Sequence, residues 1–335
     1  MNISIIGSGS FGTALAIMLA NMGHRVCLWS FCKDEYTSLV EHKENRGFLP
    51  GFVIPQNVKH TTDISECASA DILVCALPSF AIREVLGRFR SYVKKGQILL
   101  NVSKGLEINT LLTLSGVIAD VLPGCEIAVM SGPSHAEEVA ARIPTTNVVA
   151  AKHIKIAHSI QDAFMNPYFR VYTHDDILGV ELGGALKNVI ALCAGISDGL
   201  GFGDNTKAAL MTRGMYEITK LGTAMGARAE TFSGLTGVGD LIVTCTSRHS
   251  RNRRAGILIG QGKTAEEAIK EIKMVVEGIN TCRAAKHLSD KIKVEMPITQ
   301  EAYAVLYENK PAREATMSLM LRDKKHESEE GFLGI

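Results

Sequence analysis

The sequence lacks several features that mark specialised classes of protein. It has one tryptophan, aromatic residues make up 6% of it, and its lysine and arginine (36) nearly balance its aspartate and glutamate (35). A chain this close to neutral has no overall basic footprint, so no nucleic-acid partner is expected. No uninterrupted apolar stretch reaches the length of about 18 residues that a membrane helix requires, so no membrane span is predicted.

Cysteine spacing and the N-terminus exclude further classes. The eight cysteines form no CxxC pair, so no zinc or redox-dithiol spacing is present and no metal site is predicted. Cys75 and Cys193 lie in apolar runs, where cysteine acts as a small core residue. The chain begins directly with a strand-like run, without the basic and apolar regions of a signal peptide. We therefore expect a cytoplasmic protein.

A glycine-rich turn follows the first strand-like run. The order is a β run at Asn2–Ile6, the motif GSGSFG at 7–12, a helical segment at 13–22 and a second β run at Arg25–Trp29. GxGxxG between a strand and a helix is the fingerprint of dinucleotide binding. Its place at the start of such a unit makes it specific.

The three motif glycines have separate roles in that fingerprint. Gly7 permits the tight turn, Gly9 lets the backbone approach the pyrophosphate, and Gly12 lets the helix pack closely on the strand. The N-terminus of the helix then faces the phosphates.

The end of the second β run bears on the choice between NAD and NADP. NAD enzymes usually place Asp or Glu there, to bind the ribose 2′-hydroxyl. Here the residues are Ser30-Phe31-Cys32-Lys33, with no acid before Asp34. Nothing in that run repels a 2′-phosphate and Lys33 would attract one, so the sequence favours NADP or use of both cofactors.

Apolar runs at 72–77, 98–102, 127–130 and 148–151 continue the alternation with helical segments. Unbroken apolar strands between helices indicate a parallel sheet covered on both faces, a doubly wound Rossmann-type α/β fold. Ligands bind beyond the carboxyl ends of such strands.

The residues that follow these strands are therefore candidates for ligand contact: Pro78, Lys104 and the segment from Gly132 to Ala136. His135 has the side chain of a catalytic acid, but a histidine that begins a helix is as often structural.

From about residue 180 the pattern becomes helical, so residues 1–180 are predicted as the dinucleotide-binding domain and 181–335 as an all-helical substrate-binding domain. The stretch 180–200 reads as a buried helix in which Lys187 follows Gly183-Gly184. Lys187 either faces a ligand or extends its stem along the helix to reach water. The residues 323–335 are expected to form a loose tail.

The segment 234–256 contains more candidate ligand-binding residues than any other stretch of similar length. Gly234, Gly237 and Gly239 predict a flexible backbone before Asp240, and the four arginines that follow are Arg248, Arg251, Arg253 and Arg254. Ser250 is placed to cap a helix that begins at Arg251. Helix-start amides with a guanidinium bind phosphate, so a small phosphorylated ligand is favoured over a solvated basic loop or a nucleic-acid patch.

Six segments carry a family resemblance over nearly the whole chain: GSGSFGTALA (7–16), NVSKGLE (101–107), SGPSHAEEVA (131–140), ELGGALKNVIALCAGI (181–196), GLTGVGDLIVTCTSRHSRNRRAG (234–256) and VVEGINT (275–281). Together they resemble the bacterial NAD(P)-dependent glycerol-3-phosphate dehydrogenases. The resemblance implies reversible reduction of dihydroxyacetone phosphate to sn-glycerol 3-phosphate for glycerophospholipid synthesis, and a homodimer.

The resemblance also implies roles for individual residues. Lys187 matches the catalytic lysine, which accepts the proton when the alcohol is oxidised, and it also contacts substrate. The other residues implied to bind substrate are Lys104, Gly132, Ser134, Asp240, Ser250, Arg251 and Asn252. Those implied to bind the cofactor, besides the glycine turn, are Ser10, Phe11, Phe31, Lys104, Ala136, Arg251, Val275 and Glu277. Many relatives carry arginine at the position of Phe31, two residues after Trp29.

Two alternatives stay open. A dehydrogenase of the same plan could act on a β-hydroxyacid or a 6-phosphogluconate-like substrate, in which case the arginines would bind a carboxylate. A non-catalytic NAD(P)-sensing regulator would bind the cofactor without turnover.

Overall fold

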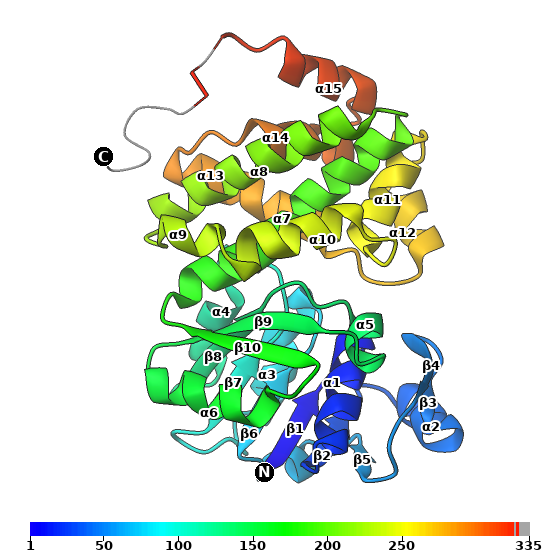
Figure 1. The fold of residues 1–335 in the computed structure, drawn as a ribbon, viewed down its shortest axis with the longest axis vertical. Helices are drawn as coiled ribbons and strands as arrows, with labels where there is room; N and C mark the ends of the chain where they lie inside the picture. Colours follow the sequence, from blue (N-terminus) through cyan, green and yellow to red (C-terminus); the bar gives the residue numbers. More distant parts are fainter. Residues whose placement is uncertain (325, 328–335) are drawn as a thin grey trace.

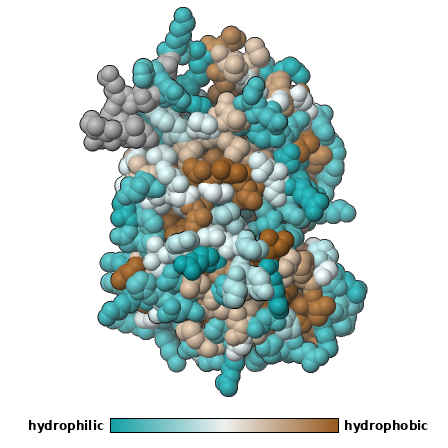
Figure 2. Space-filling view, in the orientation of Figure 1, coloured by the Kyte–Doolittle hydropathy of each residue, from teal (hydrophilic) through white to brown (hydrophobic). Residues whose placement is uncertain are grey.

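The computed structural model describes residues 1–324, 326 and 327. A sheet-containing half built from the N-terminal part of the chain lies against a helical half (Figure 1). On the face seen in Figure 2, hydrophilic side chains lie mainly around the rim of the sheet-containing half, and hydrophobic ones gather in patches on both halves. Of the predicted loose tail, residues 325 and 328–335 lie outside the described residues.

The strands are β1 (Asn2–Ile6), β2 (Arg25–Trp29), β3 (Glu44–Asn45), β4 (Leu49–Val53), β5 (Val58–Thr61), β6 (Ile72–Cys75), β7 (Ile98–Asn101), β8 (Glu126–Ser131), β9 (Thr145–Ala151) and β10 (Phe169–His174). Eight of them form one sheet in the order β10-β9-β8-β7-β6-β1-β2-β5, while β3 and β4 form a separate hairpin. The predicted doubly wound sheet is confirmed. One expectation was wrong, because β9 runs antiparallel to β8.

The helices of the first half are α1 (Ser10–Asn21), α2 (Lys33–His42), η1 (Ile64–Cys67), η2 (Ser79–Ala81), α3 (Ile82–Phe89), α4 (Leu114–Val121), α5 (Ala136–Ala140) and α6 (Ile154–Phe164). They cover both faces of the sheet. Ile3 and Ile5 of β1 share a core with α1, α5 and α6, whereas Ile6 packs with α3 and α4. This alternation follows from successive strand side chains pointing to opposite faces.

The second half is helical, as predicted. Its elements are α7 (Ile177–Gly199), α8 (Asp204–Ala224), α9 (Ala229–Phe232), η3 (Leu235–Gly239), α10 (Asp240–Thr246), α11 (Arg251–Gly260), α12 (Ala265–Ile272), α13 (Glu277–Ile292), α14 (Pro297–Tyr307) and α15 (Ala312–Met320). Among the described residues α7 alone is long and apolar enough to cross a membrane, and 83% of its most apolar window is buried in the protein. It is thus the central helix of the core.

Glycines let neighbouring backbones touch α7. A Cβ at Gly183 would lie 3.0 Å from the backbone oxygen of Thr236, and one at Gly195 only 2.0 Å from that of Arg253. The close approach expected at Gly183-Gly184 is confirmed. The segment before Asp240, however, is not a flexible loop: η3 is a π-helical turn in which Gly237 packs against the backbone of Phe232.

Candidate active site

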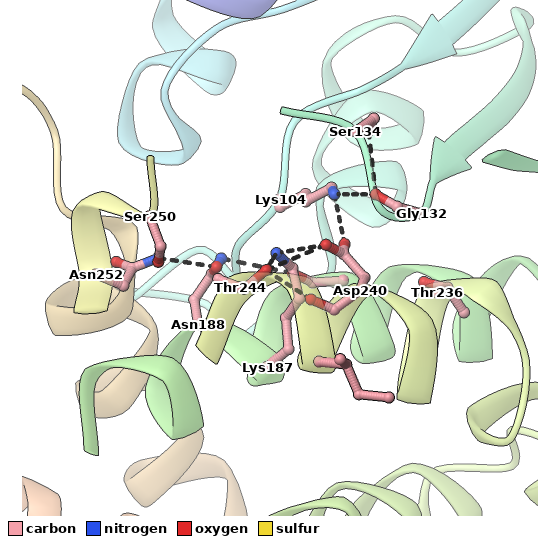
Figure 3. Close-up of polar contacts among 12 residues, drawn as sticks. Lys104, Gly132, Ser134, Lys187, Asn188, Thr236, Asp240, Thr244, Ser250 and Asn252 are labelled. Atoms are coloured by element: carbon pink, nitrogen blue, oxygen red, sulfur yellow. Dashed lines mark hydrogen bonds and ion pairs between the residues drawn. The ribbon is translucent and has the colours of Figure 1, made fainter. Parts of the chain in front are cut away.

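Lys187 projects from the middle of α7 into a buried polar cluster. Its side chain is 6% exposed, and its Nζ lies 2.8 Å from Asp240 Oδ1 and donates a hydrogen bond to Thr244 Oγ1 at 2.6 Å (Figure 3). Thr244 in turn donates to the backbone oxygen of Asp240 at 2.6 Å, one turn earlier in α10. The ammonium is therefore held inside the protein and does not extend to water along the helix.

Lys104 reaches the same carboxylate from the other half of the chain. It follows β7, and its Nζ lies 2.5 Å from Asp240 Oδ2 and 3.0 Å from the carbonyl oxygen of Gly132 (Figure 3). Ser134 Oγ donates to the same carbonyl at 3.0 Å. The structure thus brings Lys104 and the segment after β8, both expected at strand ends, together with Lys187 through Asp240.

The charges of this cluster shift the pKa values of Lys187 and Asp240. Burial lowers the pKa of Lys187 to about 8, Lys104 lowers it as well, and Asp240 opposes both. Burial alone would raise the pKa of the Asp240 carboxyl, but the two ammonium groups hold it below its usual value. Lys187 can therefore exchange its proton near neutral pH, which a general acid or base requires.

His135 does not join this cluster as an acid. Burial, with the charge of Lys187 beside it, lowers the pKa of the imidazole to about 4, so the ring is neutral at pH 7. Within the described residues its buried Nε2 has no hydrogen-bond partner.

A second polar group lies next to the first, where α11 begins. Asn252 Nδ2 donates to Asn188 Oδ1 at 2.9 Å, and Asn188 directly follows Lys187 on α7. Asn252 Oδ1 accepts from the backbone N–H of Gly278 at 2.8 Å, so the side chain joins three helices. Figure 3 shows this pair beside Lys187 and Thr244.

The N-terminus of α11 is built as predicted. Ser250 is its N-cap and accepts a hydrogen bond from the backbone N–H of Arg253 at 3.2 Å. The arginines of the segment do not form one cluster, because Arg253 pairs with Asp198 and Arg254 is exposed. Burial lowers the pKa of Arg251, while the carboxylates of Glu277 and Glu137 oppose that shift.

The β1–α1 turn fits a dinucleotide. Gly7 has φ +118°, and a Cβ at Gly12 would lie 2.0 Å from the oxygen of Gly7, so neither position accepts a side chain without strain. A Cβ at Gly9 would meet nothing within 4 Å, so that position is open. The N-terminus of α1 has neither a side-chain cap nor an acid in its first turn, and its amides are available to phosphates.

Other residues implied to contact the cofactor surround this turn. Ser10 Oγ donates to the carbonyl of Phe48 at 2.7 Å, in the β3–β4 hairpin, and Phe11 packs against the core on the α1 side of the sheet. Phe31 follows β2 with 56% of its surface exposed. Ala136 is buried at the start of α5.

Val275 and Glu277 lie before and at the start of α13. Val275 is half-buried, and Glu277 crosses to the loop after β6, where it accepts hydrogen bonds from Ser79 N at 2.9 Å and Ser79 Oγ at 2.6 Å. Glu277 therefore links the helical half to a strand end of the sheet.

Sequence reasoning missed Thr244 and Asn188. For Thr244 the signal is the 3.6-residue helical period, because Thr244 is four residues after Asp240. For Asn188 the signal is its place directly after Lys187 on a helix with few polar residues. No group of three or more His, Cys, Asp or Glu able to hold a metal occurs in the described part of the chain.

A turn that fits a dinucleotide and a buried ammonium of lowered pKa together fit the reduction of a carbonyl, in which a hydride and a proton are both delivered. The class is that of the NAD(P)-dependent dehydrogenases with a Rossmann-type half and a helical half. Two family profiles match, the N-terminal one of NAD-dependent glycerol-3-phosphate dehydrogenase over residues 2–157 and the C-terminal one over 176–317. The chain belongs to this family and is an oxidoreductase.

Individual relatives agree with this assignment. A glycerol-3-phosphate dehydrogenase (NAD(P)+) of Agathobacter rectalis is 56% identical over 97% of both chains, and one of Thermoanaerobacter sp. is 54% identical over 98% of this chain and 99% of the relative. A crystal structure of glycerol-3-phosphate dehydrogenase from Coxiella burnetii is 37% identical, covers 96% of this chain and 99% of its own, and has a TM-score of 0.93. A ketopantoate reductase from Ralstonia eutropha, at 16% identity and a TM-score of 0.62, is similar in fold alone.

Proposed function

We propose that Lys187 is the general acid with which this chain reduces dihydroxyacetone phosphate to sn-glycerol 3-phosphate, and the base of the reverse reaction. The observation that carries the proposal is the buried contact of Lys187 Nζ with Asp240 and Thr244. The bound NAD(P)H supplies the hydride that adds to the ketone carbon.

The proton reaches the ketone oxygen from Lys187. With a pKa of about 8 this group is mostly an ammonium at pH 7, and the proton costs little to release. Asp240 and Thr244 orient the Nζ, because each occupies one of its hydrogen-bonding directions. In the alcohol-oxidising direction the neutral amine accepts the proton, so that direction is favoured at higher pH.

Lys104 assists from the sheet side. Its ammonium lies against Asp240 and the carbonyl of Gly132, so it adds positive charge where the ketone oxygen becomes negative. Gly132 and Ser134 would bind the substrate at this edge.

The start of α11 would hold the phosphate. Ser250 leaves two backbone N–H groups of the first turn open, and Arg251 is the guanidinium at that point. With Asn252 it would fix the phosphate end of the substrate, and a fixed phosphate places the carbonyl for reaction.

For the cofactor we propose contacts from the turn residues Gly7, Gly9, Ser10, Phe11 and Gly12, and from Phe31, Lys104, Ala136, Arg251, Val275 and Glu277. The family assignment supports either NAD or NADP as cofactor.

Four wider properties are proposed, two from the family and two from the sequence pattern. The chain supplies glycerophospholipid synthesis, works in the cytoplasm and forms a homodimer. It divides into a dinucleotide-binding unit (1–180) and a substrate-binding unit (181–335).

The test is oxidation of NADPH and NADH in the presence of dihydroxyacetone phosphate, with Lys187→Ala beside the wild type. Loss of a general acid costs about 10²–10⁴-fold in rate, so the variant should lose turnover by at least 100-fold. Lys155→Ala, which removes an exposed lysine of α6, is the matched control and should keep the wild-type rate.

Two outcomes would contradict the proposal. If Lys187→Ala keeps its rate, the lysine is structural. If the wild type binds NADPH but never oxidises it with this ketone, the substrate is wrong.

A further inference from the structure

A carboxylate contacts the dinucleotide turn. It does not come from the residues directly after β2, which include no acid, but from α2. Glu35 lies in the first turn of α2, and its Oε2 accepts a hydrogen bond from Ser8 Oγ at 2.7 Å. Ser8 stands between Gly7 and Gly9, so the carboxylate lies on the turn itself.

Ser8 is a rigid support for this contact. It is 2% exposed, and its carbonyl oxygen accepts hydrogen bonds from Asn45 Nδ2 at 2.6 Å and Thr13 Oγ1 at 3.2 Å. In the described part of the chain Ser8 is the one side chain that donates a hydrogen bond to Glu35 Oε2, and Oε1 has no protein donor. Oε1 can therefore accept from a ligand.

The arginine that lies on the Phe31 ring is already paired with a carboxylate. The Arg88 guanidinium lies 5.3 Å from the centre of the Phe31 ring, and its Nη2 is 2.5 Å from Glu84 Oε1, one helical turn earlier. Lys33 is exposed and is followed directly by two acids, Asp34 and Glu35. Where many relatives have an arginine, this chain thus has a neutral ring and an arginine already paired.

The spacing of Glu35 from the glycine motif matches a known role for a carboxylate, although Glu35 lies in the first turn of α2 and not at the end of β2. In dinucleotide-binding folds an acid about 20 residues beyond the glycine motif accepts hydrogen bonds from the ribose hydroxyls. A 2′-phosphate replaces such a donor with a dianion, which a nearby carboxylate repels.

We infer that Glu35 binds the adenosine ribose hydroxyls and makes this chain prefer NADH to NADPH. The inference rests on the dinucleotide site of the proposed function, and it departs from the leaning towards NADP drawn from residues 30–33. The hydrogen bond to Ser8 fixes the position of the Glu35 carboxylate, and the negative charge of the carboxylate discriminates between NADH and NADPH.

The test measures binding of each cofactor alone, by isothermal titration calorimetry without triose phosphate. The wild type should bind NADH about tenfold more tightly than NADPH, equal to about 1.4 kcal/mol. Glu35→Gln keeps a side chain of the same shape but removes the charge, so the ratio should fall to within about threefold, mainly through tighter NADPH binding. Asp34→Asn, the matched control, removes the neighbouring exposed carboxylate and should leave the ratio unchanged.

Adenosine 5′-phosphate and adenosine 2′,5′-bisphosphate, titrated in the same way, should show the same preference and the same response to Glu35→Gln. A wild type that binds NADPH more tightly would overturn the inference, as would an equal shift in Asp34→Asn. If the binding ratios are as expected but no ketone is reduced, the proposed reaction fails and the inference stands. If neither dinucleotide binds, both fail together.

Discussion

Replacing Asp240 by asparagine should move the titration of Lys187 to lower pH. The carboxylate lies 2.8 Å from the Nζ and opposes the effects of burial and Lys104 on its pKa. Opposite unit charges about 4 Å apart attract by about 4 kcal/mol at an effective dielectric constant of about 20, which is equivalent to about 3 pKa units. Asparagine keeps the size of the side chain and removes this attraction, so Lys187 should be largely neutral at pH 7.

The assay is the pH dependence of kcat in both directions. Ketone reduction needs the ammonium, so the wild-type rate should be constant at low pH and fall as pH rises through about 8. In Asp240→Asn the fall should begin about 2–3 pH units lower, and the rate at pH 7 should drop by about 10- to 100-fold. Asp290→Asn, which breaks an exposed ion pair on α13, should leave the profile unchanged. A fall that stays near pH 8 in Asp240→Asn, at any absolute rate, would refute this account of the Lys187 pKa.

Three further predictions concern packing, stability and substrate affinity. Gly256→Ala would place a Cβ 2.1 Å from the backbone oxygen of Leu192 and should cost at least about 2 kcal/mol in urea unfolding, whereas Gly87→Ala, with nothing within 4 Å in α3, should not destabilise. Burial raises the pKa of Glu217 to about 7, so the protonated group stabilises the fold at low pH and this contribution is lost as pH rises through 7. The free energy of unfolding should therefore fall by about 3 kcal/mol between pH 4.5 and 8, and by less in Glu217→Gln. An unchanged pH dependence in the variant would contradict this role of Glu217. Ser250→Ala should lower stability by about 1 kcal/mol and raise the KM for the triose phosphate more than it lowers kcat, as steady-state kinetics would show; an unchanged KM would remove Ser250 from the phosphate site.

The elements that could be predicted are those with a local cause. The β1–α1 turn is specified by three glycines in fixed spacing, and the cap at Ser250 by one hydroxyl before a run that can only be helical. Lys104 was found because parallel strands end at one edge of a sheet, a rule that needs no knowledge of the partners.

What was missed depends on contacts between distant segments. The antiparallel direction of β9 depends on how the chain returns to the sheet, and its apolar composition is the same in either direction. The position of Glu35 depends on α2 folding back over the turn, so its separation from Ser8 along the chain carries no hint of the hydrogen bond. In the same way Arg253 looks like a phosphate ligand until α7 places Asp198 beside it.

The burial of α7 against both the sheet and the other helices has a consequence for how the protein unfolds. Val180 packs with Val129, Val148 and Ala150 of the sheet, whereas Leu192, about three turns further on, packs among the helices. If either half unfolded, one end of α7 would lose its packing contacts, and the half that stayed folded also depends on α7. Calorimetry should therefore record one cooperative transition, and a fragment that ends before α7 would leave a face of its sheet without cover.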